Sequence, residues 1–296
     1  MKGDFDPEDT AAIGRTLNEF LRHRLGEVDL RAHPAPIGNG LDTYIYAFHL
    51  RGDLPEEWSG PLVLRIYPSA EQGPKARREV DIQTFVADRG YPAPRPLAVS
   101  TNQPPLGLPF MIMPRVPGAP ALDRMKNPLA IGGVVRRLAN EQARLHQLPA
   151  EGCPLPSEPP LVERMLGEMR ADAGRFEMTD VGGQLEWAER NCSLVAEETS
   201  SVLHNDFHPL NVLLDGDSFY VLDWSDAAVG DRHCDLARTL ALFWLAPPLA
   251  PSKLERTILT LLRGYLVRAY VSAYRKVYQW TKSESVTGRR CTLFAR

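Results

Sequence analysis

The spacing of hydrophobic residues changes near residue 120 of this chain. In the first part, apolar residues recur at helical spacing over residues 6–26, which begin with Asp-Pro-Glu-Asp, and this predicts a helix. Residues 35–52 change to a two-residue alternation, which predicts a strand entered through a glycine-containing turn. The following segments predict two strands at residues 61–68 and 108–118, a helix at residues 71–90 and an extended stretch at residues 91–100.

From about residue 121 the pattern is mainly helical. Helices are predicted at residues 131–149, 159–176, 182–192, 232–246 and 252–281, with two short strands at 211–214 and 219–223. This order of strands followed by helices predicts an α+β fold with two lobes: a small β-rich N-terminal lobe of residues 1–116 and a larger helical C-terminal lobe of residues 117–296. The Pro-rich segment 114–120 is the predicted hinge, and residues 282–296 are predicted to be a disordered basic tail.

Composition narrows the class of protein. The 296 residues are 44% hydrophobic and 24% charged, as in ordinary globular proteins. The apolar runs are too short and too often broken by proline to span a bilayer, and the N-terminus lacks a signal-peptide pattern, so no membrane partner is expected. The four cysteines show no CxxC spacing, which favours a reduced, cytoplasmic protein without a zinc knuckle. The sequence does not specify an oligomeric state.

Charge is distributed unevenly. Residues 151–251 carry 18 acidic and 6 basic side chains, although the whole chain has a net charge of only −3. Such an acidic segment argues against a nucleic-acid groove, because phosphates would be repelled. Two interpretations remain: the segment attracts a cationic partner, or it consists of solvated helix faces.

The densest group of polar residues is "HNDFHPLN", residues 204–211. Asp206 and Asn211 lie five residues apart around a proline, and Asp223 follows the two short predicted strands. A hairpin between Asn211 and Asp223 would bring these three side chains to one end of the strand pair. Two carboxylates and an amide form an oxygen-rich set that suits Mg²⁺, and phosphoryl transfer uses such a set.

This pattern, H-x-D-x-x-x-x-N followed by an Asp at the end of a strand, resembles the catalytic loop of kinases. In the form "HNDFHPLN…VLDWSDAAVGDRHCDLAR" it resembles the aminoglycoside phosphotransferase and choline kinase family of small-molecule kinases. Trp224-Ser225 stands where protein kinases have Phe-Gly, and no Ala-Pro-Glu motif is present, which favours the small-molecule branch. The resemblance implies a protein-kinase-like fold that uses ATP and Mg²⁺, with Asp206 as the base and Asn211 and Asp223 as metal ligands.

The resemblance also implies which residues of the first lobe bind the nucleotide. Arg65 is the only cation inside the predicted strand 61–68, where protein kinases have lysine, and its fork of N–H groups can hold phosphate oxygens. A charge inside an apolar strand needs a partner, and Glu79 on the following predicted helix is the best candidate. Lys75 and Arg77 remain alternatives to Arg65.

Two further segments of this lobe match parts of a kinase. Gly38, Asn39 and Gly40 form the turn expected over the phosphates, although it has no third glycine. The segment from Met113 to Arg115 matches the hinge, whose backbone would contact adenine.

The other polar residues near the motif have competing interpretations. His204 and His208 have the spacing of a metal-binding pair, but Pro209 argues against the helix that such a pair needs. His204 is therefore interpreted as structural. The resemblance implies that Asp235 anchors the catalytic loop, whereas its position at the start of a predicted helix would also suit a simple cap.

The acceptor of the phosphoryl group is the least determined part of the hypothesis. Asp226 and Asp231 are candidate acceptor contacts. The acidic segment favours a small, cationic acceptor of the aminoglycoside type, although the carboxyl end departs from the family pattern. Two alternatives remain: a metabolic kinase for choline, homoserine or a sugar, and a catalytically silent nucleotide-binding module.

Overall fold

The structure is a computed structural model that describes residues 5–39, 43–101, 106–178, 181–192, 200–249 and 252–278. Two compact units are present: unit 1 contains Met1–Gly118 and Leu214–Ser225, and unit 2 contains Ala119–Leu213 and Asp226–Arg296. The predicted lobes of residues 1–116 and 117–296 stay a prediction, and the units differ from them because residues 214–225 group with the N-terminal part. The predicted tail, residues 282–296, lies outside the described residues.

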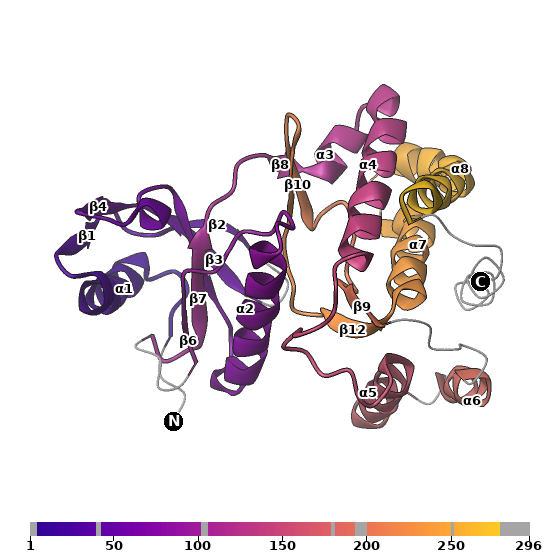
Figure 1. Ribbon diagram of the computed structural model, residues 1–296, viewed down its shortest axis with the longest axis horizontal. Helices are drawn as coiled ribbons and strands as arrows, with labels where there is room; N and C mark the ends of the chain where they lie inside the picture. The colour runs from indigo at the N-terminus through magenta and orange to yellow at the C-terminus, as the bar shows by residue number, and fades with distance from the viewer. Residues whose placement is uncertain are drawn as a thin grey trace. The chain divides into compact units, whose positions relative to one another are not determined.

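Unit 1 is built around a five-stranded antiparallel sheet with the strand order β2-β3-β5-β7-β6 (Figure 1). Its strands are β2 (Ala35–Asn39), β3 (Tyr44–Phe48), β5 (Leu62–Ile66), β6 (Ala98–Ser100) and β7 (Phe110–Pro114). The central strand, β5, is buried over its whole length. A two-stranded sheet of β1 (Val28–Leu30) and β4 (Leu50–Gly52) and a short 3-10 helix, η1 (Glu56–Trp58), complete this region.

Helix α1 (Thr10–Leu25) packs its apolar stripe into the core of unit 1. Its N-terminus is capped by Asp9, whose carboxylate accepts a hydrogen bond from the Ala12 amide, so the predicted helix at 6–26 is confirmed with a later start. The core contains Leu62, Leu64 and Ile66 of β5. Because side chains alternate across a strand, Val63 and Arg65 face the opposite side of the sheet.

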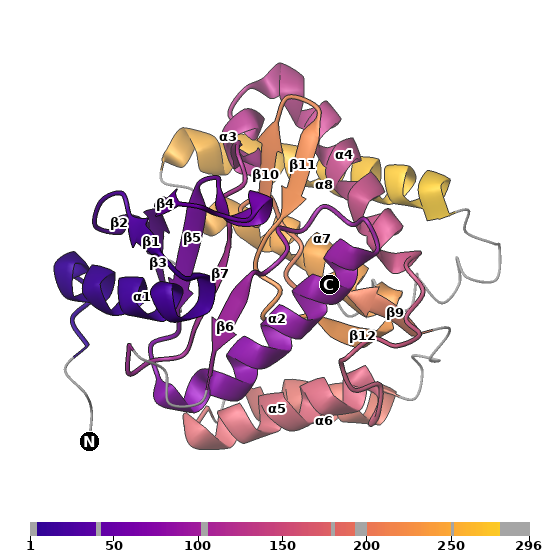
Figure 2. The same cartoon turned by 60° about the vertical axis from the view of Figure 1, so that its left-hand side comes forward.

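Helix α2 (Gly73–Asp88) packs against β6 and β7 (Figure 2). It is preceded by the 3-10 turn η2 (Ala70–Gln72), where Ser69 and Gln72 form a capping box. Glu79 and Gln83 lie on the buried face of α2, together with its apolar residues. This helix therefore presents a carboxylate to the sheet.

The chain returns to unit 1 after residue 213. Strands β10 (Val212–Asp215) and β11 (Ser218–Val221) are neighbours in a sheet and are joined by a tight turn with Gly216 at φ 55°. The Val221 amide donates to the Pro92 carbonyl at 2.7 Å, and the Trp224 ring meets the Tyr91 ring edge-on at 5.7 Å. These contacts fix the segment that carries Asp223.

Unit 2 is mainly helical. Its helices are α3 (Ala121–Met125), α4 (Pro128–His146), α5 (Leu161–Arg175), α6 (Gly182–Asn191), α7 (Arg232–Leu249) and α8 (Lys253–Tyr278), and its strands include β8 (Ala119–Pro120), β9 (Ser200–Leu203) and β12 (Ala228–Asp231). Helices α4, α7 and α8 pack together, and the aromatic stripe of α8 buries Tyr270 and Tyr274 against them. The antiparallel pair of β9 and β12 was not predicted. No helix among the described residues is long and apolar enough to cross a membrane.

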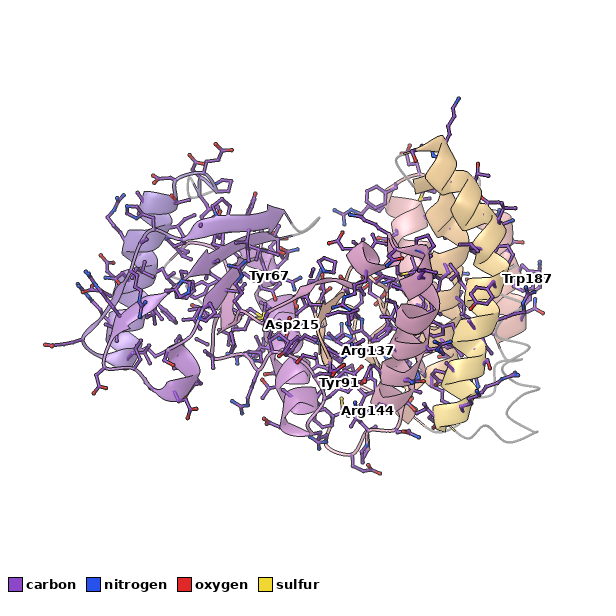
Figure 3. All side chains as sticks on the ribbon, turned by 90° about the horizontal axis from the view of Figure 1, so that it is seen from above. Tyr67, Tyr91, Arg137, Arg144, Trp187 and Asp215 are labelled. Atoms are coloured by element: carbon purple, nitrogen blue, oxygen red, sulfur yellow. The ribbon has the colours of Figure 1, made fainter. Side chains whose placement is uncertain are left out.

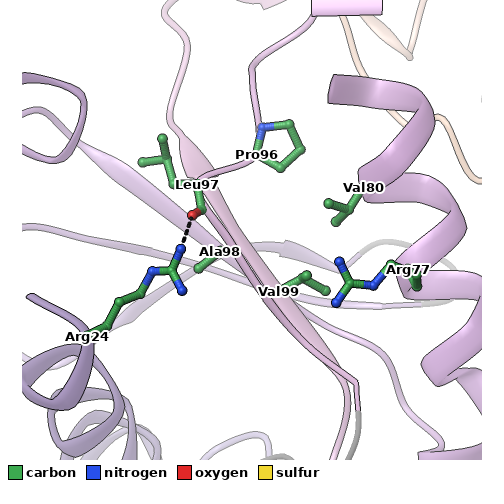
Figure 4. Close-up of a pocket in the computed structure, with 7 residues that line it drawn as sticks. All are labelled: Arg24, Arg77, Val80, Pro96, Leu97, Ala98 and Val99. Carbon is green, nitrogen blue, oxygen red and sulfur yellow. Dashed lines mark hydrogen bonds between the residues drawn. The ribbon is translucent and has the colours of Figure 1, made fainter. Parts of the chain in front are cut away.

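An open groove of about 250 Å³ lies beside β6, the edge strand of the large sheet (Figure 4). Arg24 and Arg77 flank it from α1 and α2. Arg24 donates to the Leu97 carbonyl at 3.2 Å, and Arg77 pairs with Asp81 on its own helix at 3.9 Å. Both guanidinium groups are thus engaged by the protein itself, and we assign no ligand to the groove.

Candidate active site

The first charged cluster lies in unit 1, on the face of β5 that looks towards α2. Arg65 Nη1 donates to Glu79 Oε1 at 2.7 Å, and its Nη2 donates to Asp223 Oδ1 at 3.0 Å. The Arg65 side chain is 8% exposed and that of Glu79 is fully buried. Burial alone would lower the pKa of the guanidinium, but the carboxylates of Glu79 and Asp223 raise it, so Arg65 stays charged.

Tyr67 completes this cluster from the same strand face, two residues beyond Arg65. Its hydroxyl donates to Glu79 Oε2 at 2.6 Å, so both carboxylate oxygens of Glu79 are bonded. Its side chain lies within unit 1 (Figure 3) and is completely buried. Burial, together with the charge of Glu79, raises the pKa of the Tyr67 hydroxyl, which therefore remains a donor.

Asp223 presents its carboxylate from a strained backbone. Its φ is +62°, in the left-handed region that residues with a side chain seldom adopt. The bond to Arg65 holds one oxygen, while the side chain keeps 38% exposure. Arg65, Glu79 and Asp223, which were predicted from separate segments, are thus brought together, and the carboxylate of Asp223 remains accessible to a ligand.

The predicted phosphate turn is described only in part. Gly38 and Asn39 end β2 and pair with Ile45 and Tyr44 of β3, and a register shift separates Pro36 from Gly38. A Cβ atom at Gly38 would meet nothing within 4 Å, so packing does not require glycine there. Gly40 lies outside the described residues.

Met113 and Arg115 lie at the end of β7, and the register there shows where their backbone points. The Arg115 amide donates to the Pro61 carbonyl at 2.8 Å. In an antiparallel pair every second residue bonds to the partner strand, so Met113, which pairs with Val63, also directs its backbone groups at β5. The intervening Pro114 carbonyl faces the other way.

Lys75 and Arg77, the alternatives to Arg65, lie on α2, and Arg77 pairs with Asp81 at 3.9 Å.

The second charged cluster lies in unit 2, in the loop between β9 and β10. Asn211 Nδ2 donates to Asp206 Oδ2 at 2.8 Å and to the Asp206 carbonyl at 3.0 Å. This turns the Asn211 Oδ1 away from Asp206, and no hydrogen bond to Oδ1 is found among the described residues. His208 Nδ1 accepts from the Leu210 amide, so its Nε2–H is the donor that meets Asp206 Oδ2 at 3.2 Å.

Asp206 is half-buried and stays ionised. Burial alone would raise the pKa of its carboxyl group, but the hydrogen bond from His208 and the charge of Arg238 lower it below the ordinary value. Arg238 Nη2 lies 3.9 Å from Asp206 Oδ1 and donates to Asp226 Oδ2 at 2.9 Å. The cluster therefore offers an accessible carboxylate held by two donors on one oxygen.

Asp235 anchors the loop that carries Asp206. Its oxygens accept hydrogen bonds from the backbone amides of His204 and Asn205 at 2.9 and 3.1 Å, and His146 Nε2 lies 3.0 Å away. Asp235 is fully buried, which alone would raise its pKa, but these donors hold the pKa of the carboxyl below its ordinary value. Such anchoring allows Asn205 to keep a φ of +60°.

His204 is also buried, and the structure gives it a supporting place. Its Nδ1 accepts from the Asp206 amide at 3.2 Å, and its ring meets Phe207 edge-on. A ring nitrogen occupied in this way is not a metal ligand. No group of three or more His, Cys, Asp or Glu side chains arranged to hold a metal was found among the described residues, and the histidine metal pair therefore has no support there.

The two candidate acceptor contacts differ in accessibility. Asp226 is 43% exposed and pairs with Arg238. Asp231 is 2% exposed, and its Oδ1 accepts from the amide and Nδ1 of His233 at 2.8 and 2.7 Å. An acceptor could reach Asp231 only after the surrounding residues moved, so we retain Asp226 alone as the proposed contact.

Three residues of these clusters were not predicted, namely Tyr67, His146 and Arg238, and His208 was considered only as a metal ligand. Tyr67 could have been found, because the two-residue period of a strand puts it beside Arg65. Arg238 follows Asp235 by three residues and so shares its helix face. His146 meets Asp235 across 89 residues of sequence, and nothing local indicates that contact.

Comparison with known proteins identifies the family of the chain. The model of the phosphotransferase enzyme family, APH, matches residues 35–280. An aminoglycoside 3'-phosphotransferase of Streptomyces fradiae is 28% identical over an alignment of 197 residues, and the match covers 60% of this chain and 70% of that protein.

Two solved structures show the fold. Choline kinase from Cryptosporidium parvum superposes with a TM-score of 0.64 at 12% identity, covering 95% of this chain and 86% of that one. A thermostable mutant of aminoglycoside phosphotransferase APH(4)-Ia, in a ternary complex with ADP and hygromycin B, gives 0.55 at 17% identity, covering 95% and 98%. The predicted α+β, protein-kinase-like fold is thereby confirmed. The chain belongs to the phosphotransferase enzyme family and is a kinase that acts on hydroxyl groups.

Proposed function

We propose that the protein is an ATP- and Mg²⁺-dependent kinase that transfers the γ-phosphate to a hydroxyl of a small, cationic acceptor. The observation that carries this proposal is the environment of Asp206. Its carboxylate is ionised and 31% exposed, it is oriented by Asn211 and His208, and its loop is tied down by Asp235. A base needs this combination of fixed position and access to substrate.

In the proposed reaction, Asp206 accepts the proton of the acceptor hydroxyl. The hydroxyl oxygen forms a bond to the γ-phosphorus of ATP, while the bond between the γ-phosphorus and the bridging oxygen to the β-phosphate breaks. Oδ2 is occupied by the two donors, so Oδ1 is the oxygen that receives the proton. Positioning and charge neutralisation account for most of the rate in phosphoryl transfer, and the protein makes no covalent bond to the substrate.

The chemistry of the two proposed ligands suits Mg²⁺. Asn211 Oδ1 is turned away from Asp206, Asp223 keeps an accessible carboxylate, and oxygen atoms are the ligands that this ion prefers. When bound, Mg²⁺ neutralises the phosphate oxygens. Asn211 and Asp223 are the proposed ligands.

The N-terminal lobe, residues 1–116, is the proposed nucleotide-binding lobe. Arg65, held by Glu79, would contact phosphate oxygens, and the turn at Gly38, Asn39 and Gly40 would cover them. In the hinge, the register of β7 favours the Pro114 carbonyl for adenine, because the Arg115 amide donates to Pro61 and Met113 pairs with Val63 of β5. A related structure contains ADP, which supports this assignment.

The acceptor is proposed from charge. Residues 151–251 carry 18 acidic and 6 basic side chains, and Asp226 exposes a carboxylate near the proposed base. This excess of negative charge favours amine-bearing molecules. Related proteins are named for aminoglycosides, and one structure holds hygromycin B. A metabolic acceptor such as choline is the second candidate, supported by the superposition on choline kinase. We propose a cytoplasmic location, because the four cysteines show no CxxC spacing and suit a reduced compartment.

The proposal is tested by measuring ADP release with ATP and Mg²⁺ across a panel of aminoglycosides, choline, homoserine and simple sugars. We expect Mg²⁺-dependent turnover with an amine-bearing alcohol. Turnover with an uncharged sugar alone would overturn the cationic acceptor. Nucleotide binding without turnover on any acceptor would favour the catalytically silent module.

A further inference from the structure

Tyr67 is a fully buried side chain that has no role in the proposed reaction. It stands immediately after β5 and has no exposed surface. Its hydroxyl donates to Glu79 Oε2 at 2.6 Å and lies 3.9 Å from the Met111 sulfur. A buried tyrosine commonly finds a hydrogen-bond partner, but here the partner is the carboxylate that holds Arg65.

The bond from Tyr67 controls how the carboxylate of Glu79 can turn. Glu79 Oε1 accepts from Arg65 Nη1 and Oε2 accepts from Tyr67, so the carboxylate plane is fixed at both ends. Nη2 of the rigid, planar guanidinium then points at Asp223 Oδ1. Without the tyrosine hydroxyl, a buried carboxylate oxygen would lose its donor, and the carboxylate would be free to rotate with Arg65.

Tyr46 provides a comparison within the same sheet. It lies on β3, is 2% exposed, and its hydroxyl donates to the Pro7 carbonyl at 2.6 Å. The two hydroxyl groups donate bonds of equal length, although the bond of Tyr46 is part-buried and that of Tyr67 is buried. Their partners also differ: a backbone carbonyl for Tyr46, and the carboxylate that orients Arg65 for Tyr67.

We propose that Tyr67 is a positioning residue for the nucleotide phosphates, acting through Glu79 to fix the guanidinium of Arg65. This inference rests on the proposed function, in which Arg65 contacts the phosphates. It adds Tyr67 to Arg65 and Glu79 as a residue that acts on the phosphates. The adenine contacts, in contrast, do not depend on the hydroxyl of Tyr67.

The test compares Tyr67→Phe with Tyr46→Phe in the full chain. Both substitutions remove one tyrosine hydroxyl and keep the ring, so the packing of the ring in the sheet is preserved in each variant. Calorimetry gives the dissociation constants of the non-hydrolysable analogue AMP-PNP with Mg²⁺ and of adenosine, which has no phosphates. We expect Tyr67→Phe to weaken AMP-PNP binding about tenfold and adenosine binding less than twofold. Tyr46→Phe should leave both unchanged.

Equal weakening of both ligands by Tyr67→Phe, or equal effects of the two variants on AMP-PNP, would show a merely structural role and overturn the inference. If the wild-type protein binds no AMP-PNP, the proposed function itself fails, so the two failures are distinguishable. Kinetics provide a second readout, because a loss of phosphate positioning raises the KM for ATP while the dependence on acceptor concentration is unchanged.

A double variant, Tyr67→Phe with Glu79→Gln, tests the route through Glu79. The double variant and Glu79→Gln both lack the carboxylate, so the comparison between them isolates the hydroxyl of Tyr67, and circular dichroism checks that both variants fold. Because Tyr67 acts through the Glu79 charge, the double variant should bind AMP-PNP within twofold of Glu79→Gln alone. A tenfold further loss in the double variant would mean that Tyr67 acts independently, and would overturn the proposal.

Discussion

The charged clusters of the two units are held in different ways. In unit 1, Arg65 and Glu79 are buried, and each charge meets an opposite charge within 3 Å. In unit 2, Asp206 keeps 31% of its side-chain surface, and Arg238 keeps 40%. Separating the two charges of a buried ion pair leaves each charge without a partner, which is costly. A half-exposed carboxylate can instead exchange a protein partner for a substrate. We infer that the first cluster is built for a fixed geometry and the second for access.

Backbone strain occurs in both clusters and is compensated by different contacts. Asp223 has a φ of +62° and is held by its bond to Arg65. Asn205 has a φ of +60°; its amide donates to Asp235, and its side chain donates to the Asp226 carbonyl. Strained residues persist only where surrounding contacts hold them in place. The first cluster therefore depends on the guanidinium of Arg65, and the second depends on the carboxylate of Asp235.

The largest effect is expected at Asp206. Replacement by Asn keeps the shape of the side chain but removes the base, and should lower kcat about a thousandfold. Replacement by Ala should abolish turnover. Both should leave the dissociation constant of ATP nearly unchanged, because the base contacts the acceptor. Steady-state kinetics and calorimetry measure the two quantities. Asp215→Asn, at an exposed position of β10, is the matched control with normal activity, and retained phosphotransfer in Asp206→Ala would contradict the assignment.

The buried cluster should show its largest effect in stability. Arg65→Leu leaves the buried charge of Glu79 without its partner, and the free energy of unfolding should fall by about 3 kcal/mol. Arg22→Leu breaks an exposed ion pair with Asp29 in the same unit and should cost less than about 1 kcal/mol. Urea unfolding followed by circular dichroism gives both values. Equal losses would show that the buried pair of Arg65 and Glu79 contributes no more to the free energy of unfolding than a surface pair.

Asp235 adds a dependence on pH. Its pKa is depressed in the folded state, so its contribution to stability is present above the ordinary pKa of 3.8 and is lost as the pH falls through the lower folded value. Asp235→Asn removes this contribution, so the variant should be destabilised by about 2 kcal/mol at neutral pH. The difference from the wild type should shrink as the solution is acidified below 3.8. Urea unfolding at several pH values measures it, and a constant difference would contradict the sign.

The extent to which these features follow from sequence depends on how local their cause is. Helix α1 follows from its apolar spacing and Asp9 cap, and the pairing of Arg65 with Glu79 follows from the need to compensate a charge inside an apolar strand. The pairing of β9 with β12 joins segments about 30 residues apart, and its four-residue strands carry too short a pattern to show a period.

The same limit applies to the candidate site. The motif spacing indicated Asp206 and Asn211, which the structure joins by a hydrogen bond of 2.8 Å. The burial of Asp231 could not be foreseen, because it depends on where helix α5 packs, and Leu161 of that helix approaches the neighbouring Gly230. The roles of Asp206 and Asn211 in the reaction stay predictions.

The smallest effect is expected at Arg238, and it tests the accessible character of the second cluster. The charge of Arg238 helps to keep the pKa of Asp206 low, so Arg238→Gln should raise that pKa and move the acid limb of the kcat/KM profile to higher pH. Activity on the acid limb should fall about threefold, with little change at the pH optimum. Because both side chains are partly exposed, 1 M salt should reduce the difference between variant and wild type. A difference that persists in high salt would mean that Arg238 contacts the substrate directly instead of acting through Asp206.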